Sequence, residues 1–389
     1  MVYLDHAATT PVRAGALEAF VRHAHAPGNA SSLHADGRAA RRVVEESRER
    51  VAEALGADPG EVVFTSGGTE ADNLGVKGLY WAARAADPRR VRILTSPVEH
   101  HAVLDSIAWL QAAHGAVVQD IPVDGHGRIE VAALRELLLA DPTTVACIVV
   151  MWANNEVGTV QPVAEVAALA AEFAVPLHVD GVQAIGALPT DFRSTGMDSL
   201  AVSGHKLGAP IGVGALLLTR RAKPVPVLHG GGQERDVRSG TLATALIAAF
   251  ADAIAAAQAA QVHEARRLTQ LRDDLVARVR GAVPDAVYNG DPVNRLPGNA
   301  HFSFPGCEGD SLLMLLDAAG VCCSTGSACN AGIPQPSHVL LAMGVDPVLA
   351  RGSLRFSLGH TSTAADVDAL VAALPAAVQR AKRAGVMTR

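Results

Sequence analysis

Residues 145–180 read VACIVVMWANNEVGTVQPVAEVAALAAEFAVPLHVD, and this stretch decides the fold class. It opens with an unbroken apolar run, Val145–Met151, and closes with a second one, Pro176–Asp180. Between them, Val163–Ala174 has the apolar spacing of a helix that packs one face against a sheet. Two continuous apolar runs joined by a helix predict parallel strands that are buried on both faces.

The same alternation extends over about residues 60–220. The other apolar runs are Glu61–Thr65, Val91–Thr95, Val117–Ile121, Ser199–Ser203 and Gly212–Leu218, and helical spacing is found at Thr69–Ala85 and His101–His114. This pattern predicts an α/β fold with a mostly parallel seven-stranded sheet flanked by helices. Ligands of such sheets bind outside the carboxyl ends of the strands, so side chains that directly follow strands are the candidates for function.

A smaller α+β unit is predicted toward the C-terminus. A long helical stretch, Thr241–Gly281, leads into it, and shorter elements are expected at His301–Phe304, Asp310–Ala319, Ser353–Ser357 and Ala364–Arg383. A chain of 389 residues is long enough for one large and one smaller core. We place the large domain at residues 14–258 and the small domain at residues 1–13 and 259–389.

Composition narrows the class of protein. Hydrophobic residues make up 49% of the chain and charged residues 19%, which favours a folded protein. The net charge is -6 and the basic residues are scattered, which argues against direct nucleic-acid binding. The start MVYLDHAATTP lacks the features of a secretion signal, and the alanine-rich stretch Leu242–Val262 contains Asp252, so we expect no membrane span. Five cysteines without a CxxC pair favour a reduced, cytoplasmic protein.

Two turns that follow strands are candidates for anion binding. Ser66–Glu70, with the sequence SGGTE, opens a helix, where the backbone at Gly68 and the hydroxyl of Thr69 are suited to a phosphate. An ordinary strand-to-helix turn has the same sequence features. Ser203-Gly204-His205-Lys206 follows another strand, and a lysine held in a dry pocket loses its proton and forms a Schiff base. A solvated surface lysine is the alternative, although the glycines and proline that follow constrain this turn.

Further polar residues follow strands at the same edge. Asp180 ends an apolar run and needs a partner, either a protonated pyridine nitrogen or the start of a helix. His100 opens a helix, and an imidazole there can stack on a ring or move protons. Asn155 lies in a turn after Val145–Met151 and either bonds a ring hydroxyl or only shapes that turn. Arg355, inside a strand-like run, is suited to a substrate carboxylate or to a structural salt bridge.

Cys329 differs from the other cysteines because small residues surround it, in the sequence STGSACNAG. A loop of this kind suits a nucleophile that must reach a substrate and then leave. Cys322 and Cys323 lie in an apolar run and are expected in the core, and a disulfide between Cys323 and Cys329 is a less favoured alternative. We expect no metal site.

Nine segments in the same order resemble the cysteine desulfurases of the NifS and IscS-like group, in the class V aminotransferase family of fold-type I enzymes. They are YLDHAATTP, FTSGGTEADN, VEHHAVL, NNEVG, HVDGVQA, SGHKLGAP, HGGGQERDVRSGT, STGSAC and LRFSLG, and they span Tyr3 to about Gly359. The resemblance implies the cofactor pyridoxal 5'-phosphate (PLP), L-cysteine as substrate, a homodimer and a sulfur-acceptor or scaffold protein as partner.

The resemblance also implies a role for each matching residue. Lys206 matches the Schiff-base lysine, Asp180 the partner of the pyridine nitrogen, and His100 the stacking histidine that also acts as acid or base. Arg355 matches the arginine that binds the substrate carboxylate, and Cys329 the persulfide cysteine. The remaining matches are Asn155 and Gln183 for the ring hydroxyl, Thr69, Ser203 and His205 for the phosphate, and Thr241 for a phosphate ligand that reaches in from the other subunit.

Some alternatives stay open within this resemblance. A selenocysteine lyase or a cysteine sulfinate desulfinase shares the amino-acid head group, which Arg355 and Lys206 cannot distinguish, although Cys329 favours cysteine. A non-catalytic sulfur-assembly scaffold is disfavoured by the intact lysine, aspartate and cysteine. The chain has His360 where many relatives have arginine. The destination of the sulfur, whether iron–sulfur clusters, tRNA thiolation or thiamine and molybdopterin synthesis, is not indicated by the sequence.

Overall fold

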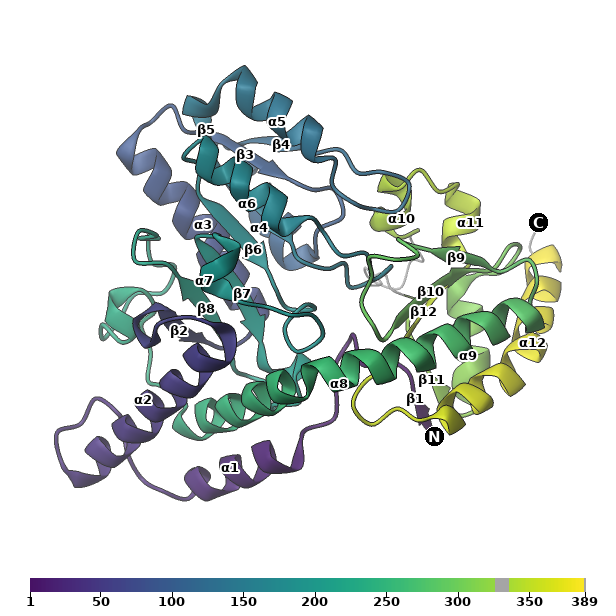
Figure 1. Ribbon diagram of the computed structural model, residues 1–389, viewed down its shortest axis with the longest axis horizontal. Helices are drawn as coiled ribbons and strands as arrows, with labels where there is room; N and C mark the ends of the chain where they lie inside the picture. Colours follow the sequence, from purple (N-terminus) through teal and green to yellow (C-terminus); the bar gives the residue numbers. More distant parts are fainter. Residues whose placement is uncertain (326–335, 388–389) are drawn as a thin grey trace.

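The structure is a computed structural model that describes residues 1–325 and 336–387, with side chains as far as Arg383. Its centre is a seven-stranded sheet in the order β2-β8-β7-β6-β5-β3-β4 (Figure 1). The strands are β2 (Val62–Thr65), β3 (Arg92–Thr95), β4 (Val117–Asp120), β5 (Val145–Met151), β6 (Leu177–Asp180), β7 (Ser199–Ser203) and β8 (Gly214–Leu218). Strand β8 runs antiparallel to both of its neighbours, β2 and β7, and the other pairs are parallel, which confirms the predicted α/β fold with a mostly parallel sheet.

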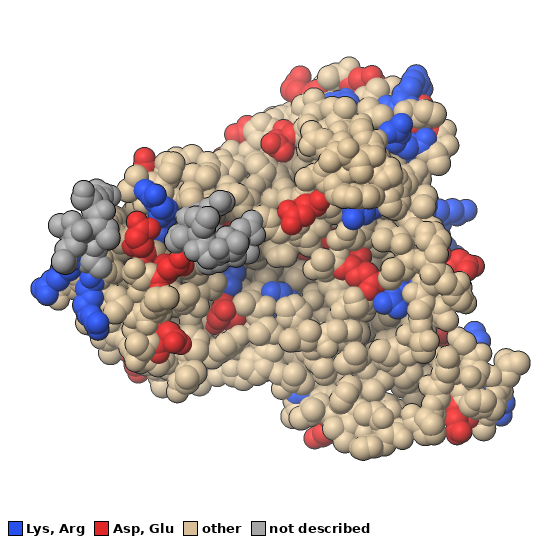
Figure 2. Space-filling model, turned by 180° about the vertical axis from the view of Figure 1, so that it is seen from behind, with Lys and Arg blue, Asp and Glu red and all other residues tan. Residues whose placement is uncertain are grey.

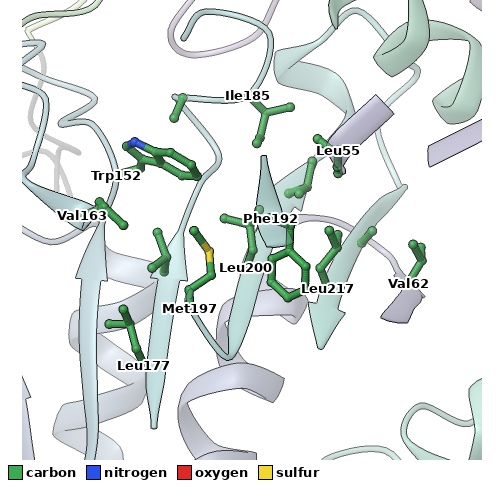
Figure 3. Close-up of a cluster of buried hydrophobic side chains, with 14 of the residues drawn as sticks. Leu55, Val62, Trp152, Val163, Leu177, Ile185, Phe192, Met197, Leu200 and Leu217 are labelled. Atoms are coloured by element: carbon green, nitrogen blue, oxygen red, sulfur yellow. The ribbon is translucent and has the colours of Figure 1, made fainter. Parts of the chain in front are cut away.

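Helices cover both faces of this sheet. They are α1 (Ala14–Ala24), α2 (Ala35–Leu55), α3 (Gly68–Ala86), α4 (His101–His114), α5 (Val131–Ala140), α6 (Val163–Glu172), α7 (Phe192–Thr195) and α8 (Thr244–Ala282), with short 3-10 turns at Pro59–Glu61, Pro142–Thr144, Gly204–Lys206 and Glu234–Asp236. Because side chains alternate along a strand, neighbouring residues enter different cores. Leu217 packs in the core shared with Phe192 and Leu200 (Figure 3), whereas Leu216 packs against α3 on the opposite face.

A second core lies beyond the large sheet. The three-stranded antiparallel sheet β9 (Val287–Asn289), β10 (Asn299–Ser303) and β12 (Ser353–Ser357) packs with α9 (Gly309–Ala318) and α12 (Ala364–Met387), and α10 (His338–Ala342) and α11 (Pro347–Arg351) lie nearby. The N-terminal strand β1 (Val2–Tyr3) pairs with β11 (Val321–Cys322), and Leu4 is buried in this second core. The start of the chain therefore lies beside its C-terminal unit (Figure 1).

Helix α8 joins the two cores, as Figure 1 shows. It is continuous through residue 258, so the domain boundaries proposed from the sequence stay a prediction. By length and composition α8 is the one helix among the described residues that could cross a membrane, but 50% of its most apolar window is buried inside the protein. Half-burial of this kind is what a core helix shows as well.

Acidic and basic side chains are interspersed on the face drawn in Figure 2. This mixed surface agrees with the scattered basic residues of the sequence and with the small net charge of -6. An interspersed surface lacks the basic stripe that a nucleic acid would need on this face.

Candidate active site

A cavity of about 480 Å³ opens where the strands of the large sheet end. Asp180 ends β6, Ser203 ends β7, and the turn after β2 lies beside them. The cavity is lined by ten of the residues predicted from the sequence, namely Gly68, Thr69, His100, Asn155, Asp180, Gln183, Ser203, His205, Lys206 and Arg355. The strand ends of the large sheet, together with β12 of the smaller sheet, therefore bring together residues that lie as far apart in the chain as 68 and 355.

Asp180 is a buried carboxylate at the floor of this cavity. Its Oδ1 accepts a hydrogen bond from the backbone N–H of Val182 at 2.9 Å. Burial and the nearby Asp72 carboxylate raise the pKa of Asp180 to about 7, because a charge without a cationic partner is unfavourable there. A cationic group placed in the cavity would stabilise the ionised form.

Asp72 also lines the cavity, and the sequence analysis did not identify it. Its Oδ1 lies 3.2 Å from Nε2 of His178, whose Nδ1 lies 2.8 Å from Oγ of Ser199. Burial raises the pKa of Asp72 to about 8 and lowers that of His178 to about 4. The pair is therefore neutral near pH 7, with the protonated Asp72 carboxyl donating a hydrogen bond to Nε2 of the neutral His178 ring. Asp72 stands three residues after Thr69 in α3, and this helical spacing was the available signal.

Lys206 points at the wall formed by the N-terminal segment. Its Nζ donates to the carbonyl oxygens of Ala7 and Ala8, at 2.5 and 2.6 Å, and Gln183 Nε2 donates to the Ala7 carbonyl at 3.0 Å. Burial, with the nearby Arg355 cation, lowers the pKa of Lys206 to about 8. The amine is therefore far easier to deprotonate than an ordinary lysine, which is what a nucleophilic lysine requires.

The turn after β2 is shaped to receive an anion. Helix α3 begins at Gly68, and its first N–H groups have no partner within the helix. A Cβ atom on Gly68 would lie 2.9 Å from Cγ2 of Val182 and 3.2 Å from Cβ of Ser203, so a larger residue would force these neighbours to shift. Ser203, at the end of β7, and His205, in the turn that follows, also line the cavity, and His205 Nδ1 lies 3.1 Å from Oγ1 of Thr9.

His100 caps the N-terminus of α4 and lines the cavity. Its Nδ1 accepts from the backbone N–H of Ala102 at 3.1 Å. Desolvation of the ring and the nearby Lys206 cation lower the pKa of His100, although Asp180 opposes the shift. A neutral ring whose Nδ1 accepts carries its proton on Nε2, so His100 has one fixed donor.

Arg355 has a structural partner and still faces the cavity. It donates from Nη2 to Oδ1 of Asp5 at 2.7 Å and from Nη1 to the carbonyl of Asn155 at 2.9 Å. The side chain is almost fully buried, and its Nε has no hydrogen-bond partner. The salt bridge considered from the sequence is therefore present, and the guanidinium keeps further N–H donors, so the role of Arg355 toward a substrate carboxylate stays a prediction.

Two predicted residues are not placed in this cavity. Thr241 is exposed and is not among the residues that line it. Cys329 lies outside the described residues. Cys323 is buried in the second core, as expected, and Cys322 is half-buried. Within residues 1–325 and 336–387, no group of three or more His, Cys, Asp or Glu side chains could hold a metal ion.

The chain matches known proteins over nearly its whole length. Residues 2–370 match the family model described as aminotransferase class-V. The chain is 57% identical to the IscS-like cysteine desulfurase of Mycobacterium tuberculosis, covering 99% of this chain and 98% of that protein. It is 40% identical to the cysteine desulfurase NifS of Azotobacter vinelandii, over 96% of this chain and 92% of that protein.

A solved structure titled as a NifS-like protein superimposes with a TM-score of 0.87 at 33% identity and covers 99% of both chains. The fold, the cavity and these similarities agree with the family suggested by the nine segments. This chain belongs to the class V aminotransferase family, in its group of NifS and IscS-like cysteine desulfurases.

Proposed function

We propose that this chain is a PLP-dependent cysteine desulfurase that converts L-cysteine to L-alanine and holds the released sulfur as a persulfide on Cys329. One observation carries the proposal. Lys206, Asp180, His100 and Arg355, predicted separately from the sequence, line a single cavity of about 480 Å³. The membership of the chain in the cysteine desulfurase group supports the same reaction.

The residues of the cavity fit the cofactor. Asp180 is a buried carboxylate whose ionised form lacks a cation, and a pyridinium nitrogen would supply one. The Gly68 turn, with Ser203 and His205, would hold the phosphate. His100 would stack on the ring, and Asn155 and Gln183 would bond its hydroxyl. Bound there, PLP supplies an electron sink for bonds broken at the α-carbon of an amino acid.

Lys206 would bond the cofactor and later move the α-proton of the substrate. Its amine is held 2.5 Å from the Ala7 carbonyl, beside the cavity, and its pKa of about 8 leaves a useful fraction unprotonated near neutral pH. Arg355 would bind the substrate carboxylate with the N–H groups that Asp5 and Asn155 leave free.

Cys329 would take the sulfur. Ser324 lines the cavity, and Cys329 follows it by five residues, a length of chain that spans at most about 17 Å. The thiolate bonds to the substrate sulfur while the bond between that sulfur and its carbon breaks, with the electron pair left on carbon. Protonation of that carbon gives alanine, and the enzyme keeps a persulfide, so no outside oxidant or reductant is needed.

The assembly state and the sulfur acceptor also belong to this proposal. Thr241 is exposed and away from the cavity of its own subunit, which suits a residue that would bind the phosphate of a second subunit in a homodimer. An acceptor or scaffold protein would then remove the persulfide sulfur, for iron–sulfur cluster assembly or thiolation. We place the enzyme in the cytoplasm on the cysteine usage of the sequence.

The test uses purified full-length protein loaded with PLP and given L-cysteine and a reductant. We expect a yellow protein that forms alanine and sulfide in equal amounts, and a Lys206→Ala variant that forms neither. L-cysteine sulfinate and L-selenocysteine are assayed beside L-cysteine. A wild-type protein that turns over either of these but leaves L-cysteine untouched would move the assignment to that substrate, and a protein that takes up no PLP would refute the proposal.

A further inference from the structure

The loop Gly232–Gly240 contains an unusual run of backbone conformations. Glu234, Arg235 and Asp236 are three consecutive residues other than glycine in the left-handed region, with φ of 46, 56 and 62°. Each such residue costs on the order of 1–3 kcal/mol, so the loop persists only because other contacts hold it. Those contacts hold the loop to β2 and place Arg238 beside Glu70.

The strained residues are anchored to the strand that leads into the anion-binding turn. The Glu234 carboxylate accepts from Arg48 Nη1 and Nη2, at 2.8 and 2.6 Å, and from the backbone N–H of Phe64 at 2.7 Å. Arg235 Nη2 donates to the carbonyl of Val62 at 2.9 Å. Both contacts fix the loop to β2, immediately before Ser66.

The same loop places Arg238 beside Glu70, in the first turn of α3. Arg238 donates from Nε to Oε1 of Glu70 at 2.7 Å and from Nη2 to Oε2 at 3.2 Å. The same Oε2 accepts the backbone N–H of Ser66 at 2.7 Å. Glu70 lines the cavity, whereas Arg238 is not among the described residues that do. Arg238 therefore acts on the turn through Glu70.

The Glu70 carboxylate puts a negative charge in the wall of the cavity, and Arg238 neutralises it. Partial burial opposes its ionisation, but hydrogen bonds from Arg238 and from Ser66 outweigh burial and lower its pKa, so the carboxylate is charged at neutral pH. A bare negative charge in the wall of the cavity, one residue after Thr69, would repel a phosphate dianion. Paired with a guanidinium, the same carboxylate shapes the turn without that repulsion.

We propose that Arg238 is a positioning residue for the cofactor phosphate, which neutralises Glu70 and holds its carboxylate on the N–H of Ser66. The inference rests on the proposed function, since the phosphate is that of PLP. It adds a residue that is not among the described residues that line the cavity. The strained loop would then serve to place one guanidinium beside one carboxylate.

The experiment compares equilibrium binding of two ligands, PLP and pyridoxal, which lacks the phosphate, to cofactor-free full-length protein. The variants are Arg238→Gln, Glu70→Gln, the double variant, and Arg193→Gln as a control that loses an exposed ion pair with Asp58. Arg238→Gln should weaken PLP binding by roughly tenfold or more and leave pyridoxal binding within about twofold. The double variant should recover PLP binding to within about threefold of the wild type, because no unpaired charge remains.

Four results would overturn the inference. They are unchanged PLP binding in Arg238→Gln, equal loss of PLP and pyridoxal binding in that variant, failure of the double variant to recover PLP binding, and a loss in Arg193→Gln as large as that in Arg238→Gln. Failure of the proposed function looks different, because the wild type itself would then bind no PLP or would ignore L-cysteine. A wild type that binds PLP beside an Arg238→Gln variant that binds it equally well refutes only the role of Arg238.

Discussion

Asp5 and Arg355 lie 350 residues apart in the chain and form an ion pair, with Oδ1 and Nη2 2.7 Å apart. The backbone of Asp5 is itself bridged to Ser357, two residues after Arg355 in the chain. Arg355 lines the cavity, whereas Asp5 is not among the described residues that line it. Asp5 therefore holds the guanidinium without lining the cavity itself. The N-terminal segment thereby fixes the group that would receive the substrate carboxylate.

Asp5→Asn is therefore expected to raise KM for L-cysteine by roughly tenfold with a smaller change in kcat, because a less ordered guanidinium binds the carboxylate poorly. The PLP content should stay that of the wild type. Asp5→Glu keeps the charge, so its KM should lie between that of the wild type and that of Asp5→Asn. Steady-state kinetics at saturating PLP provide the measurement, and an unchanged or lower KM in Asp5→Asn would contradict this role.

The pKa of Lys206 predicts how cofactor loading depends on pH. Below the pKa of about 8 the amine is protonated and cannot attack the PLP aldehyde, and above it the amine is free. The rate of loading should therefore rise with pH and level off above about 8, well below the ordinary lysine pKa of 10.5. Stopped-flow absorbance of cofactor-free protein mixed with PLP measures this rate. A rate that still rises steeply between pH 9 and pH 10 would show an ordinary lysine.

Asp72 should make the cofactor-free protein less stable as pH rises. Its pKa is raised from 3.8 to about 8 on folding, so the folded state binds the proton more tightly and loses stability between these values. Asp72→Asn keeps a donor for His178 and has no proton to lose. Its melting temperature should exceed that of the wild type by about 2 °C or more at pH 8, and the difference should shrink toward pH 5. A melting-temperature difference between the two proteins that does not change with pH would refute the raised pKa of Asp72.

Gly68→Ala should weaken PLP binding by roughly tenfold or more, although alanine is the better helix former by about 1 kcal/mol. The new Cβ would meet Val182 and Ser203 in the wall of the phosphate-binding turn. Gly281→Ala is the matched control, because a Cβ there meets no atom within 4 Å in α8. Absorbance titration with PLP measures both variants, and equal affinities would show that the turn tolerates a side chain.

The strands of the large sheet could be predicted from the sequence because their apolar runs are continuous. Val145–Met151 and Ser199–Ser203 were predicted with the bounds that the structure has. Helix α2 was not predicted, since it is rich in Arg and Glu and its buried face rests on widely spaced residues such as Val44, Val51 and Leu55. Its stability depends on packing against α8, which no local pattern shows.

The candidate site was predictable where a polar residue follows a strand, as Asp180 and Ser203 do. Asp72 and Asp5 were missed because their partners come from other parts of the chain. Asp72 pairs with His178, 106 residues away, and Asp5 with Arg355. Spacing along a chain cannot reveal such pairs, because they form only when the sheet and the N-terminal segment are assembled.

The position of the sulfur released from L-cysteine tests the proposed reaction most directly. Wild-type enzyme, Cys329→Ala and Cys323→Ala are each given one equivalent of L-cysteine without reductant, and alanine is measured while thiols are alkylated. The extra sulfur is then located by fragmenting the tryptic peptide Leu296–Arg351, which carries four of the five cysteines. We predict a persulfide on Cys329 in the wild type and in Cys323→Ala, and neither persulfide nor alanine in Cys329→Ala. Alanine formed by Cys329→Ala at the wild-type rate would contradict the account.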